Sequence, residues 1–142
     1  MTAKVLIFDI GGTEFDWNTA VVETLDRVAP PQSMPQLDRQ AFAFACHAQF
    51  MELNGAIMRG EKLWLTADQI HANVMEELWG RIGLPELASD AQLDLAHSWR
   101  RMPAWSSARE AIASLQEKYI VAPLTILGWS MAVGSCRING IN

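Results

Sequence analysis

Cysteine is scarce in this sequence. The 142 residues include two, Cys46 and Cys136, far apart in the chain and outside any Cys-x-x-Cys or Cys/His grouping. A disulfide framework needs several cysteines, and a structural zinc site needs Cys or His ligands at short spacing. The sequence therefore favours neither, and we expect a reducing, cytoplasmic location.

Long apolar runs and clusters of positive charge are also missing. No run approaches the ~18–20 apolar residues that cross a bilayer, and the N-terminus leads directly into a short β-like segment instead of a signal-peptide core. The 11 Lys and Arg against 16 Asp and Glu give a net charge of −5. Nucleic-acid binding proteins carry a basic patch, and none is visible here. We expect neither a membrane nor a nucleic acid as a partner.

The apolar content is sufficient for one folded domain. Half of the residues are hydrophobic and 19% are charged, over a length typical of a single domain. Two short apolar runs, residues 4–8 and 119–125, have the pattern of strands that are buried on both faces, as in parallel sheets. About a hundred residues without a convincing strand separate them.

The sequence between the two runs has helical periodicity. Apolar residues recur at helical spacing over residues 17–28 and 37–54, and the second helix is expected to end near Gly55. Three capping-box patterns stand directly before further periodic runs and begin at Thr66, Ser89 and Ser107. The sequence thus predicts an α/β fold with a helical insertion after its first strand.

Candidate chemistry follows the predicted strands, because ligands bind at the carboxyl ends of the strands in an open parallel sheet. Asp9 stands at the end of the first strand and Thr125 at the end of the second. A carboxylate at a buried strand end is either hydrogen-bonded by the following loop or used in chemistry. Gly11 and Gly12 either form a tight turn or let backbone N–H groups approach an anion.

The first strand and its loop resemble a known motif. Residues 5–17, VLIFDIGGTEFDW, are similar to motif I of the haloacid dehalogenase (HAD) superfamily, an apolar strand followed by DxxGTxxD. Motif II is a weaker match, because Thr-Ile-Leu-Gly at residues 125–128 replaces the usual Ser-Asn-Gly. Similarity to the 2-haloacid dehalogenase branch continues through residues 63–78, 98–105 and 119–125.

The resemblance implies an architecture. A HAD-like, Rossmann-like parallel sheet would be formed by residues 1–16 and 107–142, with a helical cap at residues 17–106 inserted after the first strand. The family's motif III lysine and motif IV acid have no counterpart in the 142 residues. We therefore expect a chain that is truncated after motif II and a core that is incomplete at its C-terminal end.

The resemblance also implies an activity, the hydrolytic dehalogenation of short 2-haloacids. Asp9 would be the nucleophile, forming an aspartyl ester that water then hydrolyses. Gly11 stands where HAD phosphatases have an acid for the leaving alkoxide, and a halide needs no such proton. No metal and no other cofactor are implied. The expected partner is the 2-haloacid, and a homodimer is compatible with this prediction.

Further residues match positions with a role in the family. Thr13 would orient Asp9, or else serves as a loop or N-cap hydroxyl. Thr125 would hold the substrate carboxylate, and Arg39 would reach from the cap to the departing halide, or else is a solvated arginine. Trp17 lines an apolar pocket or packs in the core. Surface or helix positions without a ligand role are expected for His47, His71 and His97.

Two other classes of protein remain open. DIGGT at residues 9–13 is also similar to the first phosphate loop of sugar kinases, whose chain continues into a β-hairpin where residues 17–29 here have a helical pattern. The other alternative is a non-catalytic HAD-like remnant or interaction module, because motifs III and IV have no counterpart.

Overall fold

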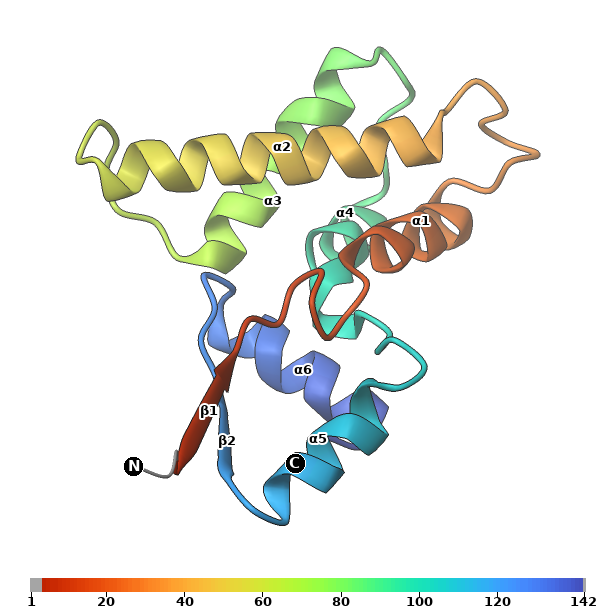
Figure 1. Ribbon diagram of the computed structural model, residues 1–142. Coiled ribbons are helices and arrows are strands. Elements are labelled where there is room, and N and C mark those ends of the chain that lie inside the picture. Colours follow the sequence, from red (N-terminus) through yellow and green to blue (C-terminus); the bar gives the residue numbers. More distant parts are fainter. Residues whose placement is uncertain (1–3, 142) are drawn as a thin grey trace.

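A computed structural model describes residues 4–141 of the chain (Figure 1). Two short parallel strands, β1 (Val5–Phe8) and β2 (Ile120–Pro123), pair with Val5 opposite Ile120 and Phe8 opposite Pro123. The predicted α/β class and the long helical insertion between two parallel strands are confirmed. The helices are α1 (Trp17–Val28), α2 (Arg39–Met58), α3 (Ala67–Arg81), α4 (Ser89–Ala96), the 3-10 helix η1 (Ser98–Arg101), α5 (Ala108–Gln116) and α6 (Trp129–Asn139).

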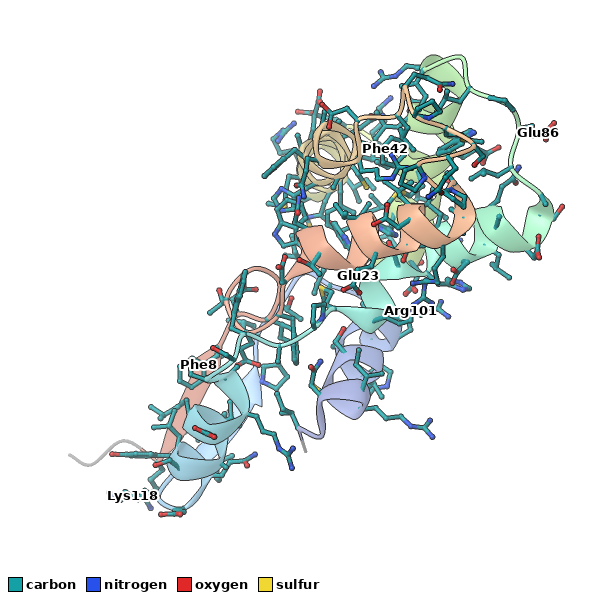
Figure 2. The ribbon with its side chains drawn as sticks, turned by 90° about the vertical axis from the view of Figure 1, so that its right-hand side faces the viewer. Phe8, Glu23, Phe42, Glu86, Arg101 and Lys118 are labelled. Carbon is teal, nitrogen blue, oxygen red and sulfur yellow. The ribbon has the colours of Figure 1, made fainter. Side chains whose placement is uncertain are left out.

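The helices α1 to α4 form a helical layer at the carboxyl ends of the two strands. Within it, α2 packs on α1 and α3, and α4 packs on the same two helices. Figure 1 shows both strands running toward this layer, with α5 and α6 beside them. In Figure 2, Phe42 and Glu86 lie toward one end of the molecule, and Phe8 and Lys118 lie toward the other. The strand ends therefore meet the helices in the middle of the molecule.

The hydrophobic core lies among the helices and not on the sheet. Val5, Ile7 and Ile120 are 47%, 58% and 66% exposed, so the prediction that both strands are buried on both faces is wrong. Over residues 4–141 each strand has a single neighbouring strand, which leaves its other edge and much of its faces uncovered. One continuous cluster instead joins the helices with the loop after β1, and it includes Ile10, Phe15, Leu25, Phe50, Val74, Leu95, Trp99 and Met131.

The loop after β1 is fixed to the segment after η1. Phe15 is fully buried, the amide of Asp16 donates to the carbonyl of Pro103 at 2.8 Å, and the amide of Trp105 donates to the carbonyl of Glu14 at 3.0 Å. Asp16 then begins α1, because its carboxylate accepts two amides of the first turn at 3.0 Å. The position of the Asp9 loop is thus set by contacts with a segment almost ninety residues later in the chain.

Helix ends follow the sequence signals in part. The capping box at Thr66 is confirmed, because its hydroxyl accepts the Gln69 amide at 3.2 Å and the Gln69 side chain accepts the Thr66 amide at 2.9 Å. Ser89 is already the first residue of α4, and neither Ser89 nor Ser107 makes a capping hydrogen bond, so those two capping boxes are wrong. The α2 helix also runs through Gly55 to Met58, beyond its predicted end.

One carboxylate near the start of α3 joins three distant segments, which we call the Asp68 cluster (Asp68, Arg100 and Ser130). Asp68 Oδ1 accepts hydrogen bonds from Arg100 Nη2 at 2.8 Å and from the Ser130 hydroxyl. Burial acts to raise the pKa of Asp68, but the bonds from Ser130 and Arg100 outweigh it and hold that pKa below its usual value. A Cβ at Gly128 would lie 2.5 Å from Asp68 Oδ2, so a side chain at this position would displace the Asp68 carboxylate.

Candidate active site

A cavity of about 300 Å³ lies where the carboxyl ends of the strands meet the helices. This volume is at the lower end of the range for small-molecule sites. The loop after β1 and the loop after β2 form one side of the cavity, and α1, α2 and η1 form the other. Its lining residues are Asp9, Gly11, Trp17, His47, Phe50, Met51, Trp99, Thr125, Ile126 and Leu127.

Asp9 presents an exposed carboxylate to this cavity. The Thr13 hydroxyl donates a hydrogen bond to Asp9 Oδ2 at 3.1 Å, which leaves Oδ1 free of that contact. Within residues 4–141 no Lys, Arg or His forms an ion pair with Asp9. Burial and the charge of Asp9 both raise the pKa of the neighbouring Glu14. Asp9 is therefore oriented through one oxygen only.

The glycine loop packs closely on two lining residues. A Cβ at Gly11 would lie 3.2 Å from Leu127, and Gly12 has φ +87° with Trp17 Nε1 3.3 Å from its Cβ position. The Gly12 amide donates to the carbonyl of Phe15 at 2.8 Å inside the loop. Gly12 therefore shapes the turn, which is one of the two roles open for it, and its N–H is bonded inside the loop.

Thr125 lies in the cavity wall directly after β2. Its hydroxyl oxygen accepts the Leu127 amide at 3.1 Å. A hydroxyl that accepts one hydrogen bond still has its own hydrogen to donate. Thr125 can thus offer an O–H to a ligand in the cavity while the turn that follows holds it in place.

Aromatic side chains form the helical side of the cavity. The Trp17 indole stacks on the His47 imidazole, with ring centroids 4.2 Å apart and planes 13° from parallel. The ring centroid of Trp99 lies 6.4 Å from that of Trp17 and 6.2 Å from that of His47. Trp99 also packs edge-on against Phe50, with 4.9 Å between the ring centroids. The wall opposite Asp9 is therefore apolar, apart from one imidazole.

Comparison with known proteins identifies the fold. Neither a protein-family model nor a curated protein matches the sequence. Among solved structures, a defluorinating L-2-haloacid dehalogenase matches with a TM-score of 0.89 at 24% identity, covering 99% of this chain and 58% of its own. A second L-2-haloacid dehalogenase matches with a TM-score of 0.89 at 20% identity, covering 99% of this chain and 60% of its own. The chain has the haloacid dehalogenase fold.

A third matching structure contains a covalently bound ligand. L-2-haloacid dehalogenase from Xanthobacter autotrophicus, solved with chloropropionic acid covalently bound, matches with a TM-score of 0.80 at 17% identity. The match covers 99% of this chain and 54% of that one. Our chain therefore spans between 54% and 60% of the length of these three dehalogenase-fold structures.

The haloacid dehalogenase fold bears on the sugar-kinase alternative. The DIGGT loop leads into helix α1, whereas the phosphate loop of sugar kinases continues into a β-hairpin. The second strand, β2, pairs parallel to β1 and comes more than a hundred residues later. The kinase alternative is therefore not supported.

In this haloacid dehalogenase fold, Arg39 lies away from the cavity. It is the first residue of α2, eight residues and about 12 Å along the helix axis from His47. Its Nε lies 2.7 Å from Asp26 Oδ1, its Nη1 donates to the carbonyl of Leu37 at 2.9 Å, and its Nη2 donates to the carbonyl of Ala29. The guanidinium fixes the connection between α1 and α2, and Arg39 is not among the residues that line the cavity.

All three histidines lie in a helix or at its end, which is within the prediction of surface or helix positions. His47 is half-buried in the cavity wall, and burial lowers its pKa. His71 is fully buried, with Nδ1 2.8 Å from the carbonyl of Ala96 and its ring 4.2 Å from Trp99, and burial lowers its pKa to about 4. His97 is half-buried at the end of α4.

Sequence reasoning missed several lining residues. Three of them could have been found from their spacing, because positions 47, 50 and 51 follow an i, i+3, i+4 pattern and so share one face of α2. Trp99 follows from neither strand motif. The missed residues are His47, Phe50, Met51, Trp99, Ile126 and Leu127.

Two further features concern metals and membranes. Among residues 4–141 no group of three or more His, Cys, Asp or Glu side chains is arranged to hold a metal ion. In the same part of the chain no helix has both the length and the apolar character needed to span a bilayer.

Proposed function

We propose that this protein is a hydrolase that removes the halogen from short 2-haloacids through an aspartyl ester on Asp9. The observation that carries the proposal is the Asp9–Thr13 pair at the end of β1. It places an oriented and exposed carboxylate in a small apolar cavity, in a chain with the haloacid dehalogenase fold. An apolar cavity suits this chemistry, because removing water from a carboxylate increases its reactivity toward carbon.

The reaction has two steps. A carboxylate oxygen of Asp9 attacks carbon 2 of the substrate, and the carbon–halogen bond breaks with its electron pair leaving on the halide. Water then adds to the ester carbonyl of Asp9, and the acyl–oxygen bond breaks. The products are the 2-hydroxy acid, the halide and one proton, and the Asp9 carboxylate is restored with one oxygen from water.

The other lining residues fit supporting roles. Thr13 holds Asp9 Oδ2, so that Oδ1 is the oxygen that attacks. Thr125 donates its hydroxyl hydrogen to the carboxylate of the substrate, while its oxygen accepts the Leu127 amide. Gly11 leaves the cavity without an acid at that position, which suits a halide because this leaving group needs no proton. Trp17 covers the apolar part of the substrate.

We further propose that residues 17–106 act as a cap over a core made of residues 1–16 and 107–142. In support, the helical layer lies at the carboxyl ends of the strands (Figure 1), and residues of α1, α2 and η1 close the cavity above Asp9. A substrate would then be held between the two parts and shielded from water.

Isotope labelling of the native gene product that carries this sequence tests the proposed mechanism. In a single turnover of a haloacetate in oxygen-18 water, the label is expected in Asp9 first, and the hydroxy acid is expected to carry the unlabelled oxygen of the enzyme. Asp9→Asn should abolish halide release. Glu14→Gln in the same loop is the matched control and should keep the label in Asp9. Label that passes directly into the hydroxy acid would mean that water attacks the substrate, and the assignment of Asp9 as the nucleophile would be wrong.

A non-catalytic interaction module is the second candidate function. It is favoured by the exposed apolar residues of β1 and β2 and by the lack of an ion-pair partner for Asp9 within residues 4–141. In this case wild type and Asp9→Asn would release no halide at all. Any halide release that depends on Asp9 rules it out.

A further inference from the structure

The cavity has an unusual charge balance for its proposed substrate. Of the described residues that line it, Asp9 and His47 are the two with ionisable side chains. A 2-haloacid is an anion at neutral pH, its leaving group is an anion, and the nucleophile is an anion as well. Like charges in a partly desolvated site repel strongly. A positive charge would offset this repulsion, and His47 is the one among the described lining residues that can carry it.

The stacking geometry makes His47 suitable for this role. Its ring lies flat on the Trp17 indole, 4.2 Å between centroids and 13° between planes. An imidazolium over the face of a tryptophan is stabilised by the negative potential of that face. The stack therefore orients the ring and favours its protonated form once an anion is present.

The nitrogens of His47 are also available. Neither makes a hydrogen bond to any residue in the range 4–141, whereas Nδ1 of the buried His71 lies 2.8 Å from the Ala96 carbonyl oxygen. Neither nitrogen of His47 is among the buried atoms that lack a partner, so both remain accessible. An accessible ring that is held from one face can direct N–H groups at a ligand.

The neighbouring charges are few. On the elements packed against this part of α2, Asp9 lines the cavity, Asp16 caps α1, and Arg100 of η1 is bound to Asp68. On α3, the buried imidazole of His71 lies against Phe50 and Trp99. Burial lowers the pKa of His47, so the ring is mostly neutral at pH 7 in the free protein. Binding of an anion would draw a proton onto it.

We propose that the imidazolium form of His47 binds an anion in this cavity, either the carboxylate of the substrate or the halide that leaves. This inference rests on the proposed function for the identity of the anion, but the anion site itself can be tested without catalysis. For the halide, it gives His47 the role that the family resemblance implied for Arg39.

Proton NMR of the imidazole ring tests the anion site directly, because the chain has three histidines. His47→Gln and His97→Gln identify the signals, and the pKa of each ring is measured alone, with sodium bromide and with sodium acetate. An anion that binds the protonated ring tenfold more tightly raises its pKa by about one unit. We expect a rise of about that size at His47, and a much smaller rise at His97, which lies outside the cavity.

The two salts distinguish the two sources of the anion. A rise of the His47 pKa with bromide identifies a halide site, and a rise with acetate identifies a carboxylate site. An equal effect of both salts on His47 and His97 would reflect ionic strength alone and would overturn the proposal.

A kinetic measurement separates this inference from the proposed function. In the native gene product, kcat/KM for a 2-haloacid should fall about tenfold or more in His47→Gln. In wild type, kcat/KM should decrease as pH rises through the pKa of His47, and this decrease should be absent in His47→Gln. His97→Gln should keep the wild-type kcat/KM and its dependence on pH. Unchanged kinetics in His47→Gln would overturn the role in catalysis, whereas a His47 pKa shift without any halide release would refute the dehalogenase and leave the anion site standing.

Discussion

His71 makes the stability of this fold dependent on pH. The ring is fully buried between helices, with Nδ1 bonded to the Ala96 carbonyl and Nε2 without a partner among the described residues. Protonation would place a charged N–H at Nε2, close to Trp99 and Phe50. Burial therefore lowers the pKa of His71 to about 4, against the opposing effect of the bond to Ala96.

The pH dependence of the unfolding free energy follows from the difference between the pKa of His71 in the native chain and in the unfolded chain. The unfolded chain has a histidine pKa near 6.5 and binds the proton more readily than the native chain, so stability falls as pH decreases from about 6.5 toward about 4. Above about 6.5 the contribution of His71 to stability is fully present. The difference between the two pKa values corresponds to about 3 kcal/mol in total, of which about 2 kcal/mol is lost by pH 5.

Urea denaturation of dilute protein between pH 7.5 and pH 5 measures this effect. Wild type should lose about 2 kcal/mol of unfolding free energy over this interval, and His71→Phe, which keeps a ring against Trp99, should lose much less. His97→Gln is the control and should keep most of the wild-type dependence. If His71→Phe shows the same pH dependence as wild type, the buried neutral imidazole is not its origin and the reasoning fails.

Paired substitutions test the helix contacts. Gly134→Ala would place a Cβ 2.5 Å from the Arg100 carbonyl oxygen and should lower the unfolding free energy by about 1–3 kcal/mol, whereas Gly80→Ala meets open space within α3 and should raise it by up to about 1 kcal/mol. Equal effects in urea denaturation would contradict the packing of α6 on η1. Thr66→Ala should lower the unfolding free energy by about 1 kcal/mol, and Ser89→Ala by less than about 0.5 kcal/mol, because a capping bond forms only at Thr66. Similar thermal midpoints for the two variants would count against this difference.

The sequence was sufficient to predict which loops meet at the cavity. Adjacent parallel strands end at the same edge of a sheet, so Asp9 and Thr125 had to lie near each other once both strands were recognised. Trp17 follows the same loop closely enough to share the cavity. These positions depend on short-range geometry and on one strand pairing.

The side of the cavity formed by the helices could not be predicted in the same way. Whether His47 or Arg39 reaches the cavity depends on where α2 crosses α1, and helical periodicity does not contain that angle. Arg39 instead finds carbonyl and carboxylate partners in a connection whose path is set by tertiary contacts. The burial of His71 behind Trp99 is likewise a result of packing between α3, α4 and η1.

The Asp68 cluster limits how the cavity can open. Its single carboxylate binds side chains of η1 and α6, and the missing side chain at Gly128 gives it the space to do so. Gly128 follows Thr125 by three residues, so the Asp68 cluster lies next to a residue that lines the cavity. A motion that keeps these bonds can rotate α3 about Asp68 but cannot slide it along α6. Helix α2, which lines the cavity, packs on α3, so the Asp68 cluster ties this wall of the cavity to the segment that follows Thr125.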